Sequence, residues 1–456
     1  MKKGGRGVLP EKFAERMKDM LGEDFDAFMN ALGESAVRAV RINETKIPTE
    51  DFLAITRLSL SPLSYAEDGF IPDSADGIGR SPEHHAGMIY VQDPGAMATV
   101  NALDIQRGWR VLDTCAAPGG KASQLASRIG EEGFLLANEY LPKRTKITVG
   151  NLERLGVRNA IVTSLDTAEL PRMFDGFFDL VLCDAPCSGE GMFRKYGEAI
   201  TEWSEENVRL CAERQKEILS NSAPCVRAGG YLLYSTCTYS YEENEQTVAH
   251  FLESHPDFSL VPVREELSAV TAPGLCGMKL ARRFYPHISK GEGQFIALMK
   301  KDENAGKKPT VLYKDAAKAP TGEEIAAVNE FFSENMTHAP RGRLIKQGEG
   351  VALLPEGTSL PPRSVFMAGV MLGEVKGRRL IPHHQLFSAY GGDFSQKERL
   401  TADDGRVEKY LRGEEIPARD CTQGWCAVTY EGVPLGGGKT SGGMIKNHYP
   451  KGLRNK

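Results

Sequence analysis

The stretch VLDTCAAPGGKASQLA, residues 111–126, decides the fold. An apolar segment ends at Asp113, a loop of small residues follows, and a helical pattern begins near Lys121. Glycines let such a loop close on a ligand, and the start of the following helix favours a negative group such as a carboxylate. The loop has neither the GxGxxG pattern of dinucleotide sites nor the P-loop of triphosphate sites. It predicts a pocket for a nucleoside cofactor, with an ordinary tight strand-to-helix turn as the alternative.

Strands and helices alternate on both sides of this loop, from about residue 93 to residue 300. The expected strands are residues 110–113, 133–138, 160–162, 178–183, 231–235 and 295–299. Helical patterns lie between them, among them residues 121–129, 144–155 and 205–226. This alternation predicts an α/β fold with a Rossmann-like core, in which a mostly parallel sheet has helices on both faces. Such sheets bind ligands at the carboxyl ends of their strands.

Smaller units flank this core. The first, residues 1–92, has two helical patterns and then AVRAVRIN (36–43), whose alternation of apolar and basic residues predicts a half-exposed strand. Residues 301–312 are charged, contain Gly and Pro and show no periodicity, which predicts a linker. Residues 313–456 hold short apolar segments bounded by Gly and Pro, which predicts a small β-rich region of one or two units. The expected catalytic domain is therefore 93–300.

Composition narrows the class of protein. The 456 residues are too many for one typical core, and 41% hydrophobic with 26% charged residues are ordinary for a soluble globular protein. No apolar run approaches the roughly 18 residues needed to cross a bilayer, and the first twenty residues lack the apolar segment of a signal peptide. We therefore expect a cytoplasmic protein with no membrane partner. Nine cysteines without a CxxC pair predict reduced thiols and no metal site.

Basic residues gather locally although the formal net charge is −5. They lie in two stretches, one near the end of the chain with Lys439, Lys446, Lys451, Arg454 and Lys456, and one between residues 279 and 300 with Arg282, Arg283 and Lys290. Local distribution matters more than total charge for nucleic-acid binding. Either patch can be a solvated surface or a nucleic-acid contact.

An acid follows the glycine loop at the distance expected for a nucleoside site. Glu139 lies twenty residues after Gly119, at the end of the next expected strand. A carboxylate there can accept hydrogen bonds from both hydroxyls of a ribose, which supports the cofactor pocket.

Two further motifs place reactive side chains at the same edge of the sheet. In DLVLCDAPCSGEGMFRK (179–195) an apolar strand ends at Asp184, and Cys187 follows in a turn that a proline stiffens. In YLLYSTCTYSYEENE (231–245) the next strand ends one residue before Cys237. Each cysteine alone is typical of a small buried hydrophobe. Two thiols and a carboxylate beside a nucleoside pocket instead indicate a catalytic site.

The motifs CAAPGGK, DAPCSGEG and STCTYS together resemble the Sun-type family of RNA 5-methylcytosine methyltransferases. YVQDPGAM (90–97), the stretch 144–156, and RFYPH with GEGQF (283–295) match the same family, so the resemblance covers the N-terminal unit and the expected core. The tail GVPLGGGKTSGGMIKNHYPKGLR (432–454) is similar to that of the RsmF subgroup, which acts on small-subunit ribosomal RNA. One departure is visible: the family commonly has a bulky aromatic residue where this chain has Gly437.

The resemblance implies a cofactor and the roles of individual residues. It implies that S-adenosyl-L-methionine binds in a pocket formed by Cys115, Ala116, Ala117, Pro118, Gly119, Gly120, Lys121, Glu139, Asp166 and Asp184. It also implies that Cys237 is the catalytic nucleophile, with Cys187 and Asp184 as its catalytic partners. The N-terminal domain and a PUA-like C-terminal region are expected to bind RNA, either small-subunit ribosomal RNA or the 30S particle.

The implied chemistry needs a nucleophilic thiol because carbon 5 of cytosine is a poor nucleophile. Addition of the Cys237 thiolate to carbon 6 makes carbon 5 enamine-like and able to accept a methyl group. Asp184 can bond to the N3 edge and draw charge from the ring. Removal of the carbon-5 proton then releases Cys237, a step for which Cys187 is placed. The target cytosine must be unstacked or single-stranded.

Other functions compete with ribosomal RNA methylation. A transfer RNA 5-methylcytidine methyltransferase would use the same chemistry, and the basic C-terminal unit favours a ribosomal substrate over it. A non-catalytic ribosome assembly factor would have no need of Cys187, Cys237 and Asp184 together. DNA cytosine methyltransferases carry their nucleophile in a Pro-Cys motif and have no second thiol in a Thr-Cys motif. A DNA substrate is therefore the one we expect least.

Overall fold

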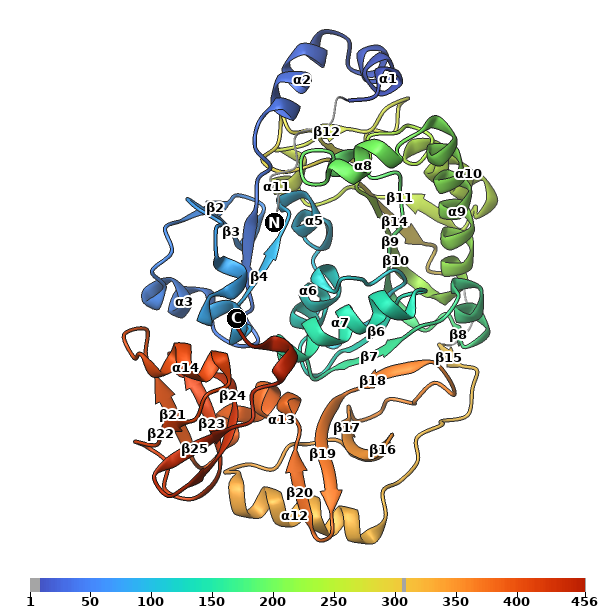
Figure 1. Cartoon of the computed structure of the whole chain (residues 1–456). Coiled ribbons are helices and arrows are strands. Elements are labelled where there is room, and N and C mark those ends of the chain that lie inside the picture. The colour runs from blue at the N-terminus through green and yellow to red at the C-terminus, as the bar shows by residue number, and fades with distance from the viewer. Residues whose placement is uncertain (1–8, 306–308, 456) are drawn as a thin grey trace.

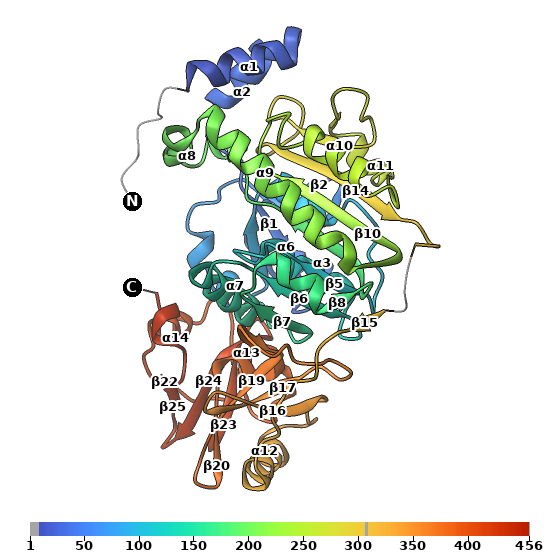
Figure 2. The ribbon, with the colours of Figure 1, turned by 90° about the vertical axis from the view of Figure 1, so that its right-hand side faces the viewer.

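The computed structural model describes residues 9–305 and 309–455. Residues 306–308 of the expected linker and Lys456 of the basic tail lie outside these ranges. Figure 1 shows the first two helices at one end of the molecule, a large central sheet, and the C-terminal sheets at the other end. Figure 2, turned by 90°, shows the same order of units.

A ten-stranded mixed sheet forms the centre of the molecule. Its inner strands follow the order β14-β10-β9-β5-β6-β7, and within this set β14 alone runs antiparallel to its neighbour. The bounds of these strands are β5 (Arg110–Asp113), β6 (Phe134–Asn138), β7 (Ala160–Thr163), β9 (Phe178–Asp184), β10 (Val226–Thr236) and β14 (Gln294–Lys301). The outer strands are β11 (Phe258–Leu260), β12 (Ala272–Pro273), β13 (Arg282–Phe284) and, at the opposite edge, β18 (Val365–Ala368).

Helices cover both faces of this sheet because successive side chains of each strand point to opposite faces. Val111 packs in one buried apolar cluster and its neighbour Leu112 in the other. The helices that complete the two clusters are α6 (Gly120–Ile129) and α7 (Pro142–Arg154) on the first face, and α9 (Glu205–Ser222) and α10 (Glu245–Ser254) on the second. The strand–helix alternation predicted from the sequence, and with it the Rossmann-like α/β core, is confirmed.

The N-terminal unit contains a four-stranded antiparallel sheet in the order β2-β3-β1-β4. Its elements are α1 (Glu11–Leu21), α2 (Phe25–Gly33), β1 (Ala39–Ile42), α3 (Thr49–Ile55), β2 (Leu60–Leu63), β3 (Ala66–Pro72), α4 (Pro82–His85), β4 (Ile89–Gln92) and α5 (Pro94–Val100). The prediction of a half-exposed strand at 36–43 is wrong, because all four residues of β1 are buried and Arg41 is 0% exposed. The reason is that β1 is an inner strand whose Arg41 donates hydrogen bonds to Gln92 and, on α6, to Ser123.

The C-terminal region contains two sheets. The first has the order β16 (Arg343–Gln347), β17 (Gly350–Leu354), β19 (Val370–Lys376), β20 (Arg379–Pro382), and packs with α12 (Gly322–Asn335) and α13 (His384–Tyr390). The second has the order β21 (Lys397–Leu400), β23 (Gly424–Tyr430), β24 (Val433–Ser441), β25 (Met444–Asn447), β22 (Ile416–Pro417), with α14 (Arg406–Arg412) beside it. The β-rich character predicted for this region is confirmed.

Two strands that follow residue 300 pair with the central unit. β18 extends the ten-stranded sheet by pairing with β7, and β15 (Thr310–Val311) pairs with β8 (Phe174–Asp175). The C-terminal region is therefore joined to the core by backbone hydrogen bonds as well as by the chain. The boundaries placed at 93–300, 301–312 and 313–456 stay predictions.

Gly437, the visible departure from the family sequence, lies on β24 beside α13. A Cβ added there would lie 2.4 Å from three ring atoms of Phe387. Phe387 thus fills the space into which a side chain at position 437 would project.

Candidate active site

A cavity of 540 Å³ lies at the carboxyl ends of β5, β9 and β10. Nine of the predicted site residues line it, namely Cys115, Ala116, Ala117, Pro118, Gly120, Lys121, Asp184, Cys187 and Cys237. Tyr90, Gln92 and Asp93, at the end of β4, line it from the N-terminal unit. The cavity therefore lies between the central sheet and the N-terminal unit, at the edge where parallel sheets bind ligands.

The glycines of the loop between β5 and α6 shape one wall. Gly119 has φ +107°, a conformation that side chains rarely adopt, and a Cβ added at Gly120 would lie 2.9 Å from the ring of Tyr90. Side chains of α7 donate hydrogen bonds to two carbonyl groups of the loop and hold its path. The backbone can therefore approach a ligand closely, as the sequence predicts.

Asp184 ends β9, and both of its carboxylate oxygens have partners. Lys121 Nζ donates to Oδ2 at 2.8 Å, and the Ser235 hydroxyl donates to Oδ1 at 2.6 Å. Burial alone would lower the pKa of Lys121, but Asp184 and, to a smaller degree, the thiol of Cys237 raise it above its usual value. A fixed cation therefore lies next to the predicted nucleophile at neutral pH.

The two predicted thiols, in the loops that follow β9 and β10, are in contact. The Sγ atoms of Cys187 and Cys237 are 3.1 Å apart, and the backbone N–H of Cys237 donates to Cys187 Sγ at 3.3 Å. The hydrogen bond to Cys237, followed by burial, raises the pKa of Cys187 well above its usual value. Cys187 therefore keeps its proton and can share it with the sulfur of Cys237.

Gly119 and two acids of the predicted pocket lie beside the cavity rather than in its wall. Glu139 directly follows β6 and is 3% exposed, and its Oε2 lies 3.7 Å from a guanidinium nitrogen of Arg144, which does line the cavity. Asp166 is exposed and accepts the N–H of Ala168 at 2.9 Å, which caps the short helical turn that follows it. The cofactor roles of Glu139 and Asp166 stay predictions.

The structure places acids at the site that the sequence reasoning missed. Asp113 lines the cavity, is 1% exposed, and its Oδ2 has no hydrogen-bond partner among the described residues. Burial, followed by repulsion from Asp184, raises the pKa of Asp113 to about 8. Glu190 and Glu243 are buried beneath the two thiol loops. The acid at the strand end of VLDTC is a readable signal for Asp113, whereas nothing in the polar stretches around Glu190 and Glu243, EGMF and YEENE, indicates their burial.

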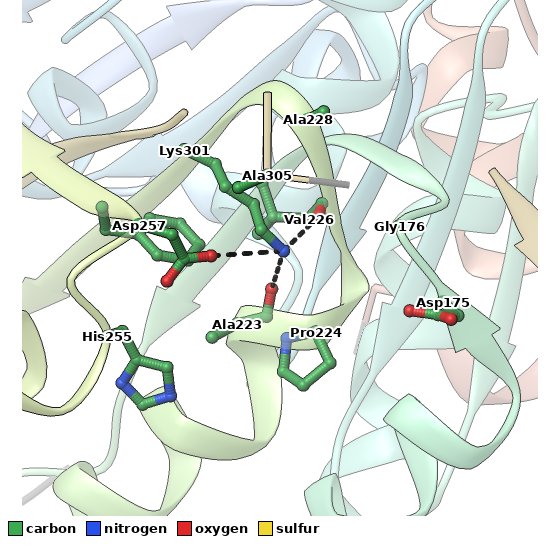
Figure 3. A pocket seen from close by; sticks show the side chains of 11 residues that line it. Asp175, Gly176, Ala223, Pro224, Val226, Ala228, His255, Asp257, Lys301 and Ala305 are labelled. Atoms are coloured by element: carbon green, nitrogen blue, oxygen red, sulfur yellow. Dashed lines mark hydrogen bonds and ion pairs between the residues drawn. The ribbon is translucent and has the colours of Figure 1, made fainter. Parts of the chain in front are cut away.

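A separate cavity of 330 Å³ lies at the other end of β10 (Figure 3). The ammonium group of Lys301 donates to the carbonyls of Ala223 at 3.3 Å and Val226 at 3.1 Å, with a carboxylate oxygen of Asp257 at 3.9 Å (Figure 3). This lysine is thus engaged with the protein itself. None of the predicted site residues lines this cavity.

The two basic patches differ in the structure. Arg283 is 1% exposed, pairs with Glu245, and donates to the carbonyl of Tyr239, so it holds the core together. The tail is more accessible: Lys439 is exposed and lies over the ring of Trp425. Lys279 and Lys290 of the other patch are exposed as well, so RNA contact stays a prediction for both patches.

All nine cysteines lie in the described part of the chain and are free thiols. Across residues 9–305 and 309–455, no group of three or more His, Cys, Asp or Glu side chains is arranged to hold a metal ion. Within the same ranges, no helix combines the length and the apolar character that crossing a membrane would need.

Comparisons with known proteins match this architecture along the chain. Three family descriptions match in order: the N-terminal domain of 16S rRNA methyltransferase RsmF at 9–94, 16S rRNA methyltransferase RsmB/F at 100–300, and the methyltransferase RsmF PUA domain at 397–455. Ribosomal RNA small subunit methyltransferase F of Erwinia tasmaniensis is 33% identical over 98% of this chain and 97% of its own length. This chain belongs to the RsmF family of 16S ribosomal RNA methyltransferases.

Other relatives agree with this membership. The RsmF protein of Klebsiella pneumoniae is 32% identical over 98% of this chain and 96% of its own. A crystal structure described as a methyltransferase homolog protein from Pyrococcus horikoshii has a TM-score of 0.56 and 30% identity, and covers 64% of this chain and 95% of that one. The predicted family resemblance, the methyltransferase core and the PUA-like region are thereby confirmed.

The cavity fits the cofactor of this RsmF-family methyltransferase, S-adenosylmethionine. The glycine loop leaves room for a close ligand, and the unpartnered oxygen of Asp113 offers a polar contact for its amino-acid end. Glu139, at the end of the neighbouring strand, stands where an acid binds the ribose in related α/β sites. These residues would hold the cofactor, which supplies a methyl group on a positively charged sulfur.

Proposed function

We propose that this protein methylates carbon 5 of a cytosine in 16S ribosomal RNA. The observation that carries the proposal is the pair of thiols, Cys187 and Cys237, 3.1 Å apart beside the ion pair of Lys121 and Asp184. Methyl transfer to an oxygen or an amino nitrogen needs no thiol nucleophile, whereas transfer to carbon 5 of cytosine does. Family membership supports the ribosomal substrate, and a substrate of that kind would place the protein in the cytoplasm.

In the attack step, Cys237 acts as a thiolate. The proton shared from Cys187 and the cationic Lys121 both stabilise negative charge on its sulfur. The sulfur bonds to carbon 6, and the electrons of the carbon 5–carbon 6 double bond move toward carbon 5 and N3. A proton carried between Asp184 and N3 neutralises the ring, and carbon 5 then accepts the methyl group.

In the release step, Cys187 acts as the base. Its pKa is raised chiefly by its hydrogen bond to Cys237, then by burial, and to a smaller degree by the charge of that thiol. The hydrogen bond and the charge are lost once the sulfur of Cys237 is bonded to carbon 6, while burial remains, so Cys187 then loses its proton to water more readily than in the free enzyme. The Cys187 thiolate takes the proton of carbon 5, the double bond re-forms, and the electron pair of the carbon–sulfur bond returns to Cys237.

The test uses purified protein, methyl-labelled S-adenosylmethionine, and 16S ribosomal RNA or 30S subunits from cells that lack the gene. We expect label in one or more cytidines as 5-methylcytidine, located by bisulfite mapping, and comparison of the two preparations identifies the form of the substrate. Transfer RNA from the same cells tests the main alternative substrate. Label in transfer RNA alone, or in a base other than cytosine, would refute the proposal.

The thiol roles are tested in the same assay. Cys237→Ala should abolish transfer, whereas Cys187→Ala should methylate once and accumulate a labelled protein–RNA adduct that survives denaturing electrophoresis. The double variant should form no adduct. Cys183→Ala is the matched control, because Cys183 is buried in the same motif and donates to Ser222 away from the cavity. Turnover by Cys237→Ala would show that the nucleophile is another group.

A further inference from the structure

Two buried carboxylates lie beneath the thiol loops, and the reaction described above uses neither. Glu243 is 0% exposed and Glu190 is 1% exposed. Within the described parts of the chain neither forms an ion pair, and neutral N–H and O–H groups surround both. A buried charge without a cation is costly unless several donors converge on it. Here most of the donors belong to the two thiol loops, so each carboxylate fixes the position of the loop that donates to it.

Glu243 holds the backbone on both sides of Cys187. The N–H of Ser188 donates to Glu243 Oε2 at 2.9 Å, and the hydroxyl of Ser188 donates to Oε1. Gln215 of α9 donates to Glu243 Oε2 at 2.8 Å and to the carbonyl of Pro186 at 3.0 Å. The residues immediately before and after Cys187 are therefore attached, directly or through Gln215, to one carboxylate.

Glu190 does the same for the other thiol. The Thr238 hydroxyl and the Tyr239 N–H each donate to Glu190 Oε2 at 2.9 Å, directly after Cys237. The hydroxyl oxygens of Ser188 and Thr238 lie 2.9 Å apart, so the two anchored loops are also in direct contact. The 3.1 Å separation of the two sulfurs thus depends on two separate carboxylates, one for each loop.

We propose that Glu243 is the positioning residue for Cys187 and, through it, sets the rate at which the methylated RNA is released. The inference rests on the proposed function, because it requires Cys187 to act in release. Glu243 is not among the residues that line the cavity, so attack and methyl transfer by Cys237 should survive its replacement. Glu190 anchors the Cys237 side and should govern attack instead.

The first experiment compares Glu243→Gln with Glu190→Gln on 16S ribosomal RNA and methyl-labelled S-adenosylmethionine. Glutamine keeps the size of each side chain, but its amide NH₂ cannot accept the bonds that the carboxylate accepts. Glu243→Gln should transfer the first methyl group at close to the wild-type rate and slow release roughly 10- to 100-fold, the effect of misplacing a catalytic group by about 1 Å. Labelled adduct should therefore accumulate. Glu190→Gln should slow the first transfer and accumulate no adduct.

A double variant separates positioning from general destabilisation. If Glu243 acts through Cys187, adding Glu243→Gln to Cys187→Ala should leave the lifetime of the adduct unchanged. A shortened lifetime, or equal behaviour of the Glu243 and Glu190 variants, would overturn the inference. If Glu243→Gln does not fold, Ser188→Ala, which removes the hydroxyl donor and keeps the carboxylate, should still lengthen the adduct lifetime. An unchanged lifetime there would equally overturn it.

The two proposals fail in different ways. If Cys187→Ala itself accumulates no adduct, the role of Cys187 in release is wrong and the inference falls with it. If Cys187→Ala accumulates adduct while Glu243→Gln turns over like the wild type, the proposed function stands and the inference alone is refuted.

Discussion

Glu139→Ala is expected to weaken binding of S-adenosylmethionine about tenfold. One carboxylate oxygen, Oε1, already accepts the N–H of Leu141 at 3.0 Å, and Arg144 lies 3.7 Å from Oε2. This leaves Oε2 for one strong hydrogen bond to a ribose hydroxyl. A hydrogen bond to a charged group contributes about 1.5–3 kcal/mol. The lower end applies because Arg144 already shares the charge, and about 1.5 kcal/mol corresponds to about tenfold in Kd.

Calorimetric titration of the purified protein with S-adenosylmethionine measures this change directly. Glu139→Gln is the matched variant: it keeps one acceptor oxygen, and its loss should be smaller than that of Glu139→Ala. Asp166→Ala provides a second comparison, because Asp166 is exposed and its structural contact is a capping bond to Ala168. Thermal unfolding of each variant shows whether it is folded. Unchanged affinity in a folded Glu139→Ala protein would refute the placement of the ribose at the end of β6.

Further outcomes follow from other parts of the structure. Removing residues 432–456 would delete β24 and β25, so the tail is better tested by replacing Lys439, Lys446 and Lys451 with Gln. If they contact phosphates, the slope of log affinity against log salt should flatten by about 0.7–0.9 per lost contact, whereas an unchanged slope favours a solvated surface. Burial raises the pKa of Glu243 from 4.5 to about 7, so the folded protein holds a proton there that the unfolded chain loses. Stability from this group is full below pH 4.5 and is lost as pH rises through 7, by at most about 1.4 kcal/mol per pH unit. The difference in unfolding temperature between wild type and Glu243→Gln should shift in that window, and a constant difference would contradict the assignment. Arg41→Met should lower the unfolding temperature and weaken binding of S-adenosylmethionine, because Arg41 donates hydrogen bonds to Gln92 and to Ser123 of α6. An unchanged affinity would show that Arg41 stabilises the fold without shaping the cofactor pocket.

The sequence predicted those parts of the site that depend on strand ends and short loops. Parallel strands carry their carboxyl ends to one edge, so Asp184 and Cys237 could be placed together from the positions of their strands alone. It could not place Glu243, because its partners Ser188 and Gln215 are 55 and 28 residues away in the chain and their meeting depends on packing of α9. The prediction that Arg41 is exposed was wrong for a related reason. Alternation of basic and apolar residues predicts that the basic ones face solvent, which does not hold where another domain covers the strand.

The burial of Arg41 also explains how the N-terminal unit takes part in the chemistry. Its guanidinium reaches the hydroxyl of Ser123 at 2.7 Å, one turn into the helix that begins at the glycine loop. On the other side of the same interface, Arg154 of α7 donates to the carbonyl of His84 at 2.6 Å. Two hydrogen bonds from charged arginines thus hold the N-terminal unit against α6 and α7. The N-terminal unit contributes Tyr90 to the cavity wall, and the two helices hold the glycine loop. RNA bound by the N-terminal unit would consequently be held at a set distance from the two thiols. If the N-terminal unit binds the RNA, the same interface would both hold the RNA and position the proposed target cytosine.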